Sequence, residues 1–515
     1  MSTIGFWAIA QEEPDSIAVV DPDERVITRG ELLASSNRIA RRLQELGLQR
    51  GDGVAWVIHN SREFLEMFLA ATQIGLYATP LNFHLTGPEI AYIVEDCEAK
   101  AFVCHERFAE ASEYAVAESG LSKEVCFAAG GPVKGCRPYE DLQDGQSSEL
   151  PENRSAGQMM LYTSGTTGRP KGVRRSLPDG DPEQGAALMA MLGALLKIEP
   201  GTGAHLLTGP FYHTAPLGFG IGSVHLGQNI VMMDKWDAEQ MLVLMDRYKI
   251  TTSHMVPTMF HRVLALPEEN RAAYDLSSLE VVLHGAAPCP VEVKRGVIEW
   301  WGPVLYEYYG ATEGGGTLVT SEEWLEHPGT VGQPWPGSEV LILDDEGKPL
   351  PEKQAGAIYM SSLAGDFSYY KDKEKTEGSR RGNLFTVGDV GYLEDGWLYL
   401  CDRKADMIIS GGVNIYPAEV EATLLTHPAV GDAAVFGIPN DEWGESVKAV
   451  VEPASGVVAD EKLAKELLAH CQKSLAKFKC PRSLDFLEEL PRQPSGKLYK
   501  RLLRDEYWKG RDRAI

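Results

Sequence analysis

The chain has 515 residues, more than a single hydrophobic core usually serves, so we expect at least two packed units. Hydrophobic residues make up 43% and charged residues 24%, which excludes a disordered or collagen-like chain. The formal net charge of −25 disfavours a general nucleic-acid binder, because phosphates repel such a surface. Residues 461–515 differ, with 14 basic against 8 acidic side chains, which leaves a solvated face or a contact with an anionic small molecule open.

The cysteine spacing and the terminal segments indicate the cellular compartment of the protein. The eight cysteines form no C-x-x-C pair, so neither a zinc framework nor a disulfide scaffold is expected, and a reduced compartment fits. The first residues lack the pattern of a secretory signal, and the last five match no peroxisomal or prenylation signal. Pro210, Pro216 and several glycines interrupt the uncharged stretch 201–233, which disfavours a membrane span. We therefore expect a cytoplasmic protein.

The N-terminal region alternates strand-like and helix-like patterns. Segments 16–21 and 25–30 flank the turn residues Pro22 and Asp23, which predicts a hairpin. Apolar residues then recur at spacings of three and four over Glu31 to Leu46, which predicts an amphipathic helix. The pattern continues with strand 53–59, a helix over 61–75 that opens at Ser61, helix 87–98 and strand 99–104. Such alternation predicts an α/β fold whose sheets are mostly parallel and covered by helices.

The composition changes beyond about residue 404. Short strand patterns at 407–412, 431–438 and 446–453 are separated by two helical patterns, and a basic end follows. We therefore predict a large N-terminal domain over residues 1–404 and a small α+β domain over residues 405–515.

The strongest local motif is TSGTTGRPKG at residues 163–172, directly after the apolar MMLY. Its glycines, hydroxyls and lysine would bring N–H donors, O–H donors and a cation to one place, which suits a polyphosphate. It is not a Walker loop, because none of its glycines has the lysine and hydroxyl spacing that such a loop requires. Composition alone leaves a flexible surface loop equally open.

This motif resembles the phosphate loop of the adenylate-forming enzymes, which include acyl-CoA synthetases, firefly luciferase and peptide-synthetase adenylation domains. Four further segments occur in the family's order: YGATE at 309–313, FTVGD ending at Asp389, DRKADMIISGGVNIYP at 402–417 and PRQPSGK ending at Lys497. Five ordered motifs are implausible by chance. The chain looks most like a bacterial acyl-CoA synthetase of the fatty-acid or steroid and bile-acid type, with a C-terminal domain that rotates about a hinge.

The resemblance implies a site for ATP and Mg²⁺. Thr312 and Glu313 would act in catalysis, with Glu313 as the metal ligand, since a hard cation prefers oxygen donors. Tyr309 would pack on adenine and Asp389 would accept hydrogen bonds from the ribose, with Arg403 beside it. Val387 stands where the family usually has threonine. The nucleotide-binding set implied is Thr163, Ser164, Gly165, Thr166, Thr167, Gly168, Lys171, Gly285, Ala286, Ala287, Tyr309, Gly310, Ala311, Thr312, Asp389 and Arg403.

The resemblance also assigns roles to the C-terminal segment. Lys497 would meet the substrate carboxylate and the α-phosphate and stabilise charge in the adenylation transition state. Ala405 occupies the hinge position, which is commonly Asp or Lys in the family. Residues implied in binding coenzyme A are Gly411, Gly412 and Trp443, with Lys477 and Lys479 as weaker candidates. A solvated face remains open for either lysine.

His213, within PFYHTAPLGFG, resembles the side chain that the family places beside the substrate carboxylate, although a lone histidine in an apolar run is more often a core residue. The acid pocket implied contains His213, Leu217, Gly218, His254, His284, Gly285, Gly314, Gly315 and Gly316. Three successive glycines would leave space, which favours a fairly large acyl group.

The expected reaction has two steps: a carboxylic acid and Mg·ATP give acyl-AMP and pyrophosphate, and the thiol of coenzyme A then takes the acyl group. Fatty, aryl and polycyclic or steroid-like acids all remain open.

The alternatives are an aryl-acid CoA ligase, a ligase that loads a carrier protein, a luciferase-like oxidative enzyme and a nucleotide-binding sensor without turnover. The absence of a long insertion between Glu313 and Asp389, and of a carrier domain after Lys497, favours free coenzyme A. No nucleic-acid partner is expected, and base rates favour a homodimer.

Overall fold

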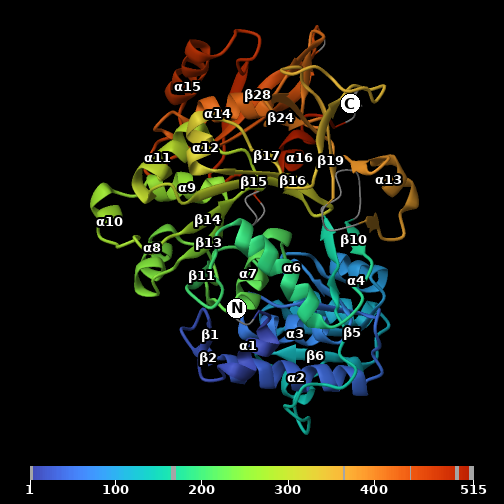
Figure 1. Cartoon of the computed structure of the whole chain (residues 1–515). Helices are drawn as coiled ribbons and strands as arrows, with labels where there is room; N and C mark the ends of the chain where they lie inside the picture. Colours follow the sequence, from blue (N-terminus) through green and yellow to red (C-terminus); the bar gives the residue numbers. More distant parts are fainter. Residues whose placement is uncertain (1–3, 164–169, 363–365, 441, 493–497, 510–515) are drawn as a thin grey trace. The chain divides into compact units, whose positions relative to one another are not determined.

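The computed structural model describes residues 4–163, 170–362, 366–440, 442–492 and 498–509 (Figure 1). Contacts divide the chain into two compact units. The first unit contains the described parts of Met1–His254, Glu269–Val282 and Gly365–Gly378, and the second contains those of Met255–Glu268, Leu283–Ala364 and Ser379–Ile515. The chain passes between units within β13 (Thr252–Met255), α10 (Glu268–Ala272) and β14 (Val281–His284). The domain boundary predicted at 404/405 falls inside the second unit and stays a prediction.

The first unit contains a six-stranded sheet in the order β7-β6-β5-β3-β4-β8, in which every pairing is parallel. Its strands are β3 (Gly53–Val57), β4 (Tyr77–Pro80), β5 (Ala99–His105), β6 (Cys126–Ala129), β7 (Arg137–Pro138) and β8 (Gln158–Met159). Val54 and Trp56 pack into one core, whereas Ala55 and Val57 pack into another. Helices α2 (Arg29–Glu45) and α3 (Arg62–Gln73) join the first core, and α4 (Gly87–Asp96) and α5 (Ala109–Glu118) join the second. The predicted helix-covered parallel sheet is therefore confirmed.

Local sequence signals explain where these helices begin. Thr28 and Glu31 form a capping box at α2, because each side chain bonds the other residue's backbone N–H, at 3.2 and 2.8 Å. Ser61 occupies the N-cap position of α3 as predicted, but its side chain makes no capping hydrogen bond. The predicted hairpin is β1 (Ile17–Val20) and β2 (Val26–Thr28), which pair antiparallel.

The other strands of the first unit form two further groups. Strands β13, β11 (Ala204–Leu207), β12 (Asn229–Met232) and β1 pair in parallel in that order. Strand β10 (Lys171–Arg175) pairs antiparallel with β9 (Leu161–Thr163) and β20 (Phe367–Tyr369). The remaining elements of this unit are α1 (Phe6–Glu12), η1 (Glu106–Phe108), η2 (Lys123–Val125), η3 (Tyr139–Leu142), α6 (Pro182–Leu195), α7 (Thr214–His225), α8 (Ala238–Arg247) and α13 (Lys373–Gly378). Within the described ranges, none of the helices combines the length and the apolar composition needed to cross a bilayer.

The second unit is built mainly from antiparallel strands. Strand β16 (Gly314–Thr320) pairs antiparallel with β15 (Leu305–Ala311) and β17 (Gln333–Pro334). A separate sheet contains β18 (Val340–Leu343), β19 (Gly356–Ser361), β21 (Arg380–Arg381), β22 (Leu384–Phe385), β23 (Asp389–Glu394) and β24 (Trp397–Arg403), and all its pairings are antiparallel. Helices α9 (Pro257–Leu264), α11 (Val291–Trp301) and α12 (Ser321–Glu326) also belong here. The predicted parallel pattern therefore does not extend over residues 305–403, because short turns such as Asp395–Gly396 join neighbouring strands directly.

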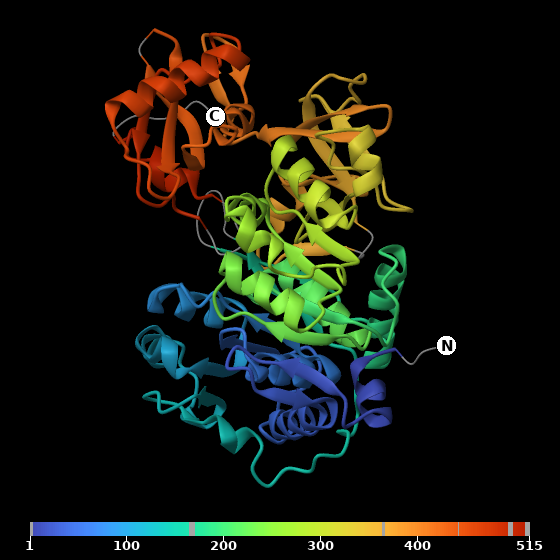
Figure 2. The ribbon, with the colours of Figure 1, turned by 90° about the vertical axis from the view of Figure 1, so that its left-hand side faces the viewer.

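The last part of the second unit has its own core. Its sheet contains β25 (Ile408–Ser410), β26 (Val413–Ile415), β27 (Val430–Asn440), β28 (Gly444–Pro453) and β29 (Ser483–Phe486). Helices α14 (Pro417–Leu425) and α15 (Glu461–Ser474) contribute Val420, Leu424 and Leu467 to this core, and α16 (Lys500–Arg504) follows (orange and red in Figure 2). The α+β composition predicted for residues 405–515 is thus confirmed for the described residues.

Three buried histidines make the first unit sensitive to acid. Burial lowers the pKa of His205 and His225 to about 4 and that of His254 to about 3. The folded chain therefore keeps these rings neutral, while the unfolded chain binds protons below about pH 6.5. The contribution of these neutral histidines to the free energy of unfolding is fully present above about pH 6.5. It is lost as the pH falls to the folded-state pKa values, at up to about 1.4 kcal/mol per histidine per pH unit.

We expect the thermal unfolding midpoint to fall steadily between about pH 6.5 and 5, as measured by circular dichroism. His225→Gln should flatten this dependence, because glutamine can still accept the hydrogen bond from Phe6 N–H, 3.2 Å away, but does not titrate. A midpoint that stays constant over this range would contradict the assignment.

Candidate active site

Asp389 is the centre of a polar group in the second unit. Its Oδ2 accepts a hydrogen bond from the Tyr309 hydroxyl at 2.8 Å, and its Oδ1 lies 3.5 Å from Arg403 Nε. The paired strands β23 and β24 place Asp389 directly opposite Arg403, and β15 supplies Tyr309. Sequence reasoning selected all three residues but not the hydrogen bond from Tyr309, which joins positions 80 residues apart.

The electrostatics of this group keep the tyrosine protonated. Burial raises the pKa of Tyr309 well above its ordinary value, and the Asp389 carboxylate raises it further. The hydroxyl is therefore a permanent donor to Asp389 at neutral pH. Asp389 itself is only 13% exposed, so its carboxylate is held in one orientation with acceptor capacity to spare.

Thr312 and Glu313 occupy the turn between β15 and β16. Glu313 is buried, with 6% of its surface exposed, and its charge contributes to the raised pKa of Tyr309. A hydroxyl and a buried carboxylate on one turn are oxygen donors of the kind that Mg²⁺ prefers, so these residues fit the predicted metal. The same unit contains Gly285 and Ala286, and Ala286 has a φ of 67°, a strained value of the kind that clusters at functional sites.

The glycine triplet does not open the space that was predicted. A Cβ added to Gly316 would lie 1.9 Å from the Tyr309 carbonyl oxygen, and one on Gly315 would lie 2.7 Å from the Met360 side chain. Both glycines also have positive φ values. They are therefore required for close packing against β15 and β19, and the argument for a large acyl group from an empty space at these two positions is wrong.

His284, predicted to line the acid pocket, lies in a buried polar group of the second unit. Its Nε2 is 3.9 Å from Glu307 Oε2, which also accepts a hydrogen bond from Lys294 Nζ at 2.8 Å. Burial raises the pKa of Glu307, and Phe260 packs edge-on against the imidazole. The His284 pocket assignment stays a prediction.

The first unit presents the two ends of the predicted phosphate loop. Thr163 ends β9 and Lys171 begins β10, directly opposite each other, with the Thr163 hydroxyl 3.4 Å from the Lys171 carbonyl oxygen. Lys171 Nζ forms an ion pair with Asp372 Oδ2 at 3.1 Å, which raises the pKa of the lysine. Ser164, Gly165, Thr166, Thr167 and Gly168 lie outside the described residues. Sequence reasoning missed Asp372, which lies 201 positions beyond Lys171 and carries no motif.

The first unit also contains four of the nine residues predicted for the acid pocket: His213, Leu217, Gly218 and His254. His213 occupies the N-cap position of α7, Leu217 is fully buried on that helix, and a Cβ on Gly218 would meet nothing within 4 Å. His254 stacks on Phe219 of the same helix at 5.4 Å between ring centroids. The positive charge of a protonated His213 would further lower the pKa of His254, so these two imidazoles are close enough to interact. Gly218 thus offers the open position that Gly315 and Gly316 do not.

The predicted coenzyme A contacts are only partly as expected. Gly411 and Gly412 have positive φ values, and a Cβ on Gly411 would lie 2.6 Å from the Trp443 ring. Trp443 is 42% exposed, and the Arg482 guanidinium lies 5.7 Å from its ring centroid. Lys479 is instead bonded to Glu419 at 2.7 and 2.8 Å. Arg482, which sequence reasoning did not select, is therefore the cation beside this exposed ring.

The predicted hinge at Ala405 contacts helix α16. Arg504 Nη1 donates to the Ala405 carbonyl oxygen at 3.2 Å and lies 3.3 Å from Asp406 Oδ1. The backbone carbonyl of Ala405 thus accepts a hydrogen bond from the Arg504 side chain, although the residue at 405 is small. Lys497 lies outside the described residues.

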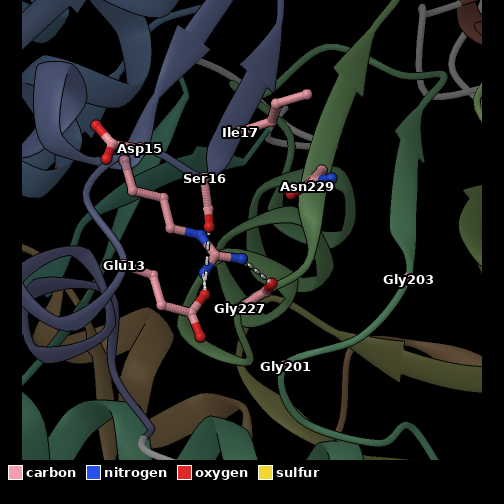
Figure 3. A pocket seen from close by; sticks show the side chains of 9 residues that line it. Glu13, Asp15, Ser16, Ile17, Gly201, Gly203, Gly227 and Asn229 are labelled. Carbon is pink, nitrogen blue, oxygen red and sulfur yellow. Dashed lines mark hydrogen bonds and ion pairs between the residues drawn. The ribbon is translucent and has the colours of Figure 1, made fainter.

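The pocket of Figure 3, with a volume of about 400 Å³, contains none of the predicted site residues. Ile17, Gly203 and Asn229 line it at the amino-terminal ends of the parallel strands β1, β11 and β12. Buried Arg29 donates to the Gly227 carbonyl oxygen at 2.6 Å and forms an ion pair with Glu13. Ligand sites of parallel sheets lie at the opposite, carboxyl ends of the strands. We therefore interpret this pocket as the surroundings of the structural ion pair between Arg29 and Glu13, not as a ligand site.

Comparison with known proteins assigns the chain to a family. The AMP-binding enzyme profile matches residues 6–365, and the AMP-binding enzyme C-terminal domain matches residues 419–497. Fatty acid–[acyl-carrier-protein] ligase ScoC from Streptomyces coeruleorubidus is 30% identical over 97% of this chain and 95% of its own length. The 2-succinylbenzoate–CoA ligase of Geobacillus kaustophilus is 33% identical over 98% of both chains. The solved structure of the anthranilate CoA ligase AuaEII in complex with anthranoyl-AMP superposes with a TM-score of 0.85 at 25% identity, over 98% of both chains. The chain therefore belongs to the AMP-binding enzyme family, that of the adenylate-forming enzymes.

Proposed function

We propose that this protein is an ATP-dependent acyl-CoA synthetase. It joins a carboxylic acid to AMP, releases pyrophosphate, and transfers the acyl group to the thiol of coenzyme A. The observation that carries the proposal is the Asp389 carboxylate, fixed by the Tyr309 hydroxyl at 2.8 Å and flanked by Arg403 at 3.5 Å. A largely shielded, oriented carboxylate of this kind suits the two hydroxyls of a ribose, and the family match makes AMP the expected nucleotide.

In the first step the chain's residues bind and orient the reactants. Asp389 accepts hydrogen bonds from the ribose, while Thr163 and Lys171 contribute a hydroxyl and a cation for the phosphates. Thr312 and Glu313 would hold Mg²⁺, which supplies charge neutralisation on the phosphate oxygens when bound. The carboxylate oxygen of the acid attacks the α-phosphorus, a P–O bond forms, and the bond to the leaving pyrophosphate breaks. Lys497 stabilises the charge that develops there.

In the second step the thiol sulfur attacks the acyl carbon and a C–S bond forms. AMP leaves with the electron pair of the broken C–O bond, and the thiol proton passes to solvent. No protein nucleophile takes part, so positioning of the reactants supplies the catalysis. A Cβ on Gly412 would meet nothing within 4 Å, so its backbone is open to a thiol-bearing arm, whereas the Trp443 ring takes the space at Gly411. Exposed Trp443, with Arg482 beside it, offers a ring and a cation to an adenine nucleotide.

For the acid we propose a medium- or long-chain fatty acid or a bulky cyclic acid. Support comes from the apolar character of α7 and from open space at Gly218. His254 is neutral above about pH 4, since its pKa is about 3, so it adds no charge that would disfavour an apolar tail. An aryl acid is the alternative, which the 2-succinylbenzoate and anthranilate ligases favour.

Loading of a carrier protein is the second candidate for the acyl acceptor. ScoC, named as a fatty acid–[acyl-carrier-protein] ligase, matches this chain over 97% of its length. The exposed Trp443 and its neighbouring Arg482 instead favour free coenzyme A, because a nucleotide can use both a ring and a cation.

The test is a panel of short, medium and long fatty acids, aryl acids and steroid side-chain acids, each incubated with Mg·ATP with and without coenzyme A. Mass spectrometry then identifies the product. We expect a coenzyme A thioester from one class of hydrophobic acid. Acyl-AMP without thioester would refute free coenzyme A as acceptor. If no acid of the panel caused ATP and the acid to be consumed, the alternative of a nucleotide-binding sensor without turnover would be favoured.

The ion pair between Lys171 and Asp372 gives a prediction for ATP binding. Asp372→Asn removes a carboxylate that competes with phosphate for the Lys171 ammonium. Since the pair is partly exposed, we expect ATP to bind roughly twofold to fivefold more tightly in an equilibrium titration. Asp345→Asn, which breaks the exposed ion pair with Lys404 at 3.0 Å, is the matched control and should leave the affinity unchanged. Weaker ATP binding by Asp372→Asn would show that Asp372 helps Lys171 rather than competing for it.

A further inference from the structure

Two cysteines of the parallel six-stranded sheet lie within reach of each other. Cys104 Sγ, near the end of β5, is 3.8 Å from Cys136 Sγ, which directly precedes β7. The strand between them, β6, places Ala128 opposite Cys104, and the small Ala128 side chain belongs to the same core. Cys136 is partly buried and packs against this core, with its sulfur beside that of Cys104. Neither residue belongs to the groups assigned to ATP, the acid or the thiol.

The two sulfurs differ in access and in charge. Cys104 is fully buried, whereas Cys136 is partly exposed. The hydrogen bond between them lowers the pKa of Cys136 and raises that of Cys104. Lys123 also lowers the pKa of Cys136, while burial and the Glu113 charge oppose this lowering. Cys136 is therefore the more accessible thiol and the one of the two whose ionisation the pair favours, and Cys104 is a buried, protonated thiol beside it. An accessible thiolate next to a second cysteine is the arrangement of redox-responsive pairs.

A third cysteine of the same core provides a comparison. Cys126 on β6 is fully buried, and burial, with the neighbouring Cys136 charge, raises its pKa to about 12. It therefore has neither the access nor the ionisation needed to react first. Its nearness to Cys136 makes it the natural competitor for the resolving role, which the experiment must separate from Cys104.

We propose that Cys104 and Cys136 form a reversible intramolecular disulfide when a peroxide oxidises Cys136. The Cys136 thiolate attacks one oxygen of hydrogen peroxide, so that an S–O bond forms and the O–O bond breaks. The departing hydroxide takes a proton and becomes water. Cys104 sulfur then attacks the sulfenic sulfur of Cys136, an S–S bond forms, the S–O bond breaks, and the second hydroxide leaves with the Cys104 proton as water. Two thiols lose two electrons in all, peroxide gains them, and a dithiol reductant restores the pair.

The disulfide would join the end of β5 to the segment before β7, across a sequence separation of 32 residues. This loop contains α5 and β6. A bond that closes such a loop restricts the unfolded chain, so the oxidised protein should unfold at a higher temperature than the reduced protein. It also removes Cys136 from further, irreversible oxidation to the sulfinic state.

The test uses the reduced full-length protein, treated with equimolar hydrogen peroxide, alkylated and digested with trypsin without reduction. Trypsin places the three cysteines in separate peptides, which cover residues 101–107, 124–134 and 135–154. We expect a species joining 101–107 to 135–154, about 2 Da lighter than the sum of its parts, and two fewer alkylated thiols than in the untreated protein. Dithiothreitol should reverse both changes.

Variants identify the role of each sulfur. Cys136→Ser should prevent the cross-link, while Cys104→Ser should leave a Cys136 sulfenic acid that dimedone labels. Cys126→Ser is the matched control and should give the wild-type cross-link, and far-ultraviolet circular dichroism checks that each variant folds. A cross-link between 124–134 and 135–154, a cross-link between two chains, or full alkylation of all eight cysteines in peroxide-treated wild type would each overturn the proposal.

Discussion

Replacing Lys497 with alanine is expected to abolish formation of acyl-AMP while thioester formation from preformed acyl-AMP continues. The lysine is proposed to stabilise charge on the α-phosphate and the attacking carboxylate, a contribution present only in the first step. Removal of one such charge-stabilising group costs about 100-fold to 1000-fold in kcat. The two half-reactions are measured separately, as pyrophosphate release from ATP and acid, and as thioester formed from synthetic acyl-AMP and coenzyme A.

Lys473→Ala is the matched control for this variant, because Lys473 is an exposed lysine of α15 in the same basic segment. It should leave both half-reactions at the wild-type rate. If Lys497→Ala slowed both steps equally, the lysine would have a general binding role. If it slowed neither, Lys497 would not act in the reaction at all.

Replacing Asp389 with asparagine is expected to weaken ATP binding by about 10-fold to 100-fold. Hydrogen bonds to a charged acceptor contribute about 1.5–3 kcal/mol, and asparagine keeps the size of the side chain while removing its charge. The Tyr309 hydroxyl can still donate to the amide oxygen, so the fold around the site should be preserved. Equilibrium titration with a non-hydrolysable ATP analogue measures the loss directly.

Asp395→Asn makes the same chemical change on the exposed turn between β23 and β24 and should bind the analogue like wild type. Tyr309→Phe separates the contributions within the site, because it removes the 2.8 Å hydrogen bond and keeps the ring. It should weaken binding less than Asp389→Asn does. Unchanged affinity in Asp389→Asn would remove the ribose assignment.

The sequence predicted those elements whose signals are local. The α2 helix followed from its apolar spacing, and the β1–β2 hairpin from the turn residues between two strand patterns. The antiparallel sheet around β23 and β24 was not predicted, although Asp395–Gly396 between two strand patterns is a recognised hairpin signal. For residues 389–403 the expectation of a mostly parallel α/β fold took precedence over the local hairpin signal at Asp395–Gly396.

Site residues with motifs were predictable, whereas their partners were not. Asp389, Tyr309 and Lys171 stand in recognisable segments, but Asp372 and Arg482 are ordinary charged residues that only the folded chain brings beside Lys171 and Trp443. The glycine triplet shows the opposite error. Sequence alone cannot tell whether a missing Cβ leaves space for a ligand or for the protein's own backbone, and at Gly316 the Tyr309 carbonyl takes that space.

The most direct test of the central claim is acid-dependent exchange of labelled pyrophosphate into ATP. This assay requires only the reversible formation of acyl-AMP from ATP and the acid, so coenzyme A and any carrier protein are left out. We predict exchange that needs Mg²⁺ and a hydrophobic carboxylic acid, proceeds without coenzyme A, and disappears in Lys497→Ala. Exchange that is independent of acid, or its absence with every acid of the panel while ATP still binds, would contradict the assignment of this protein as an acyl-adenylate-forming ligase.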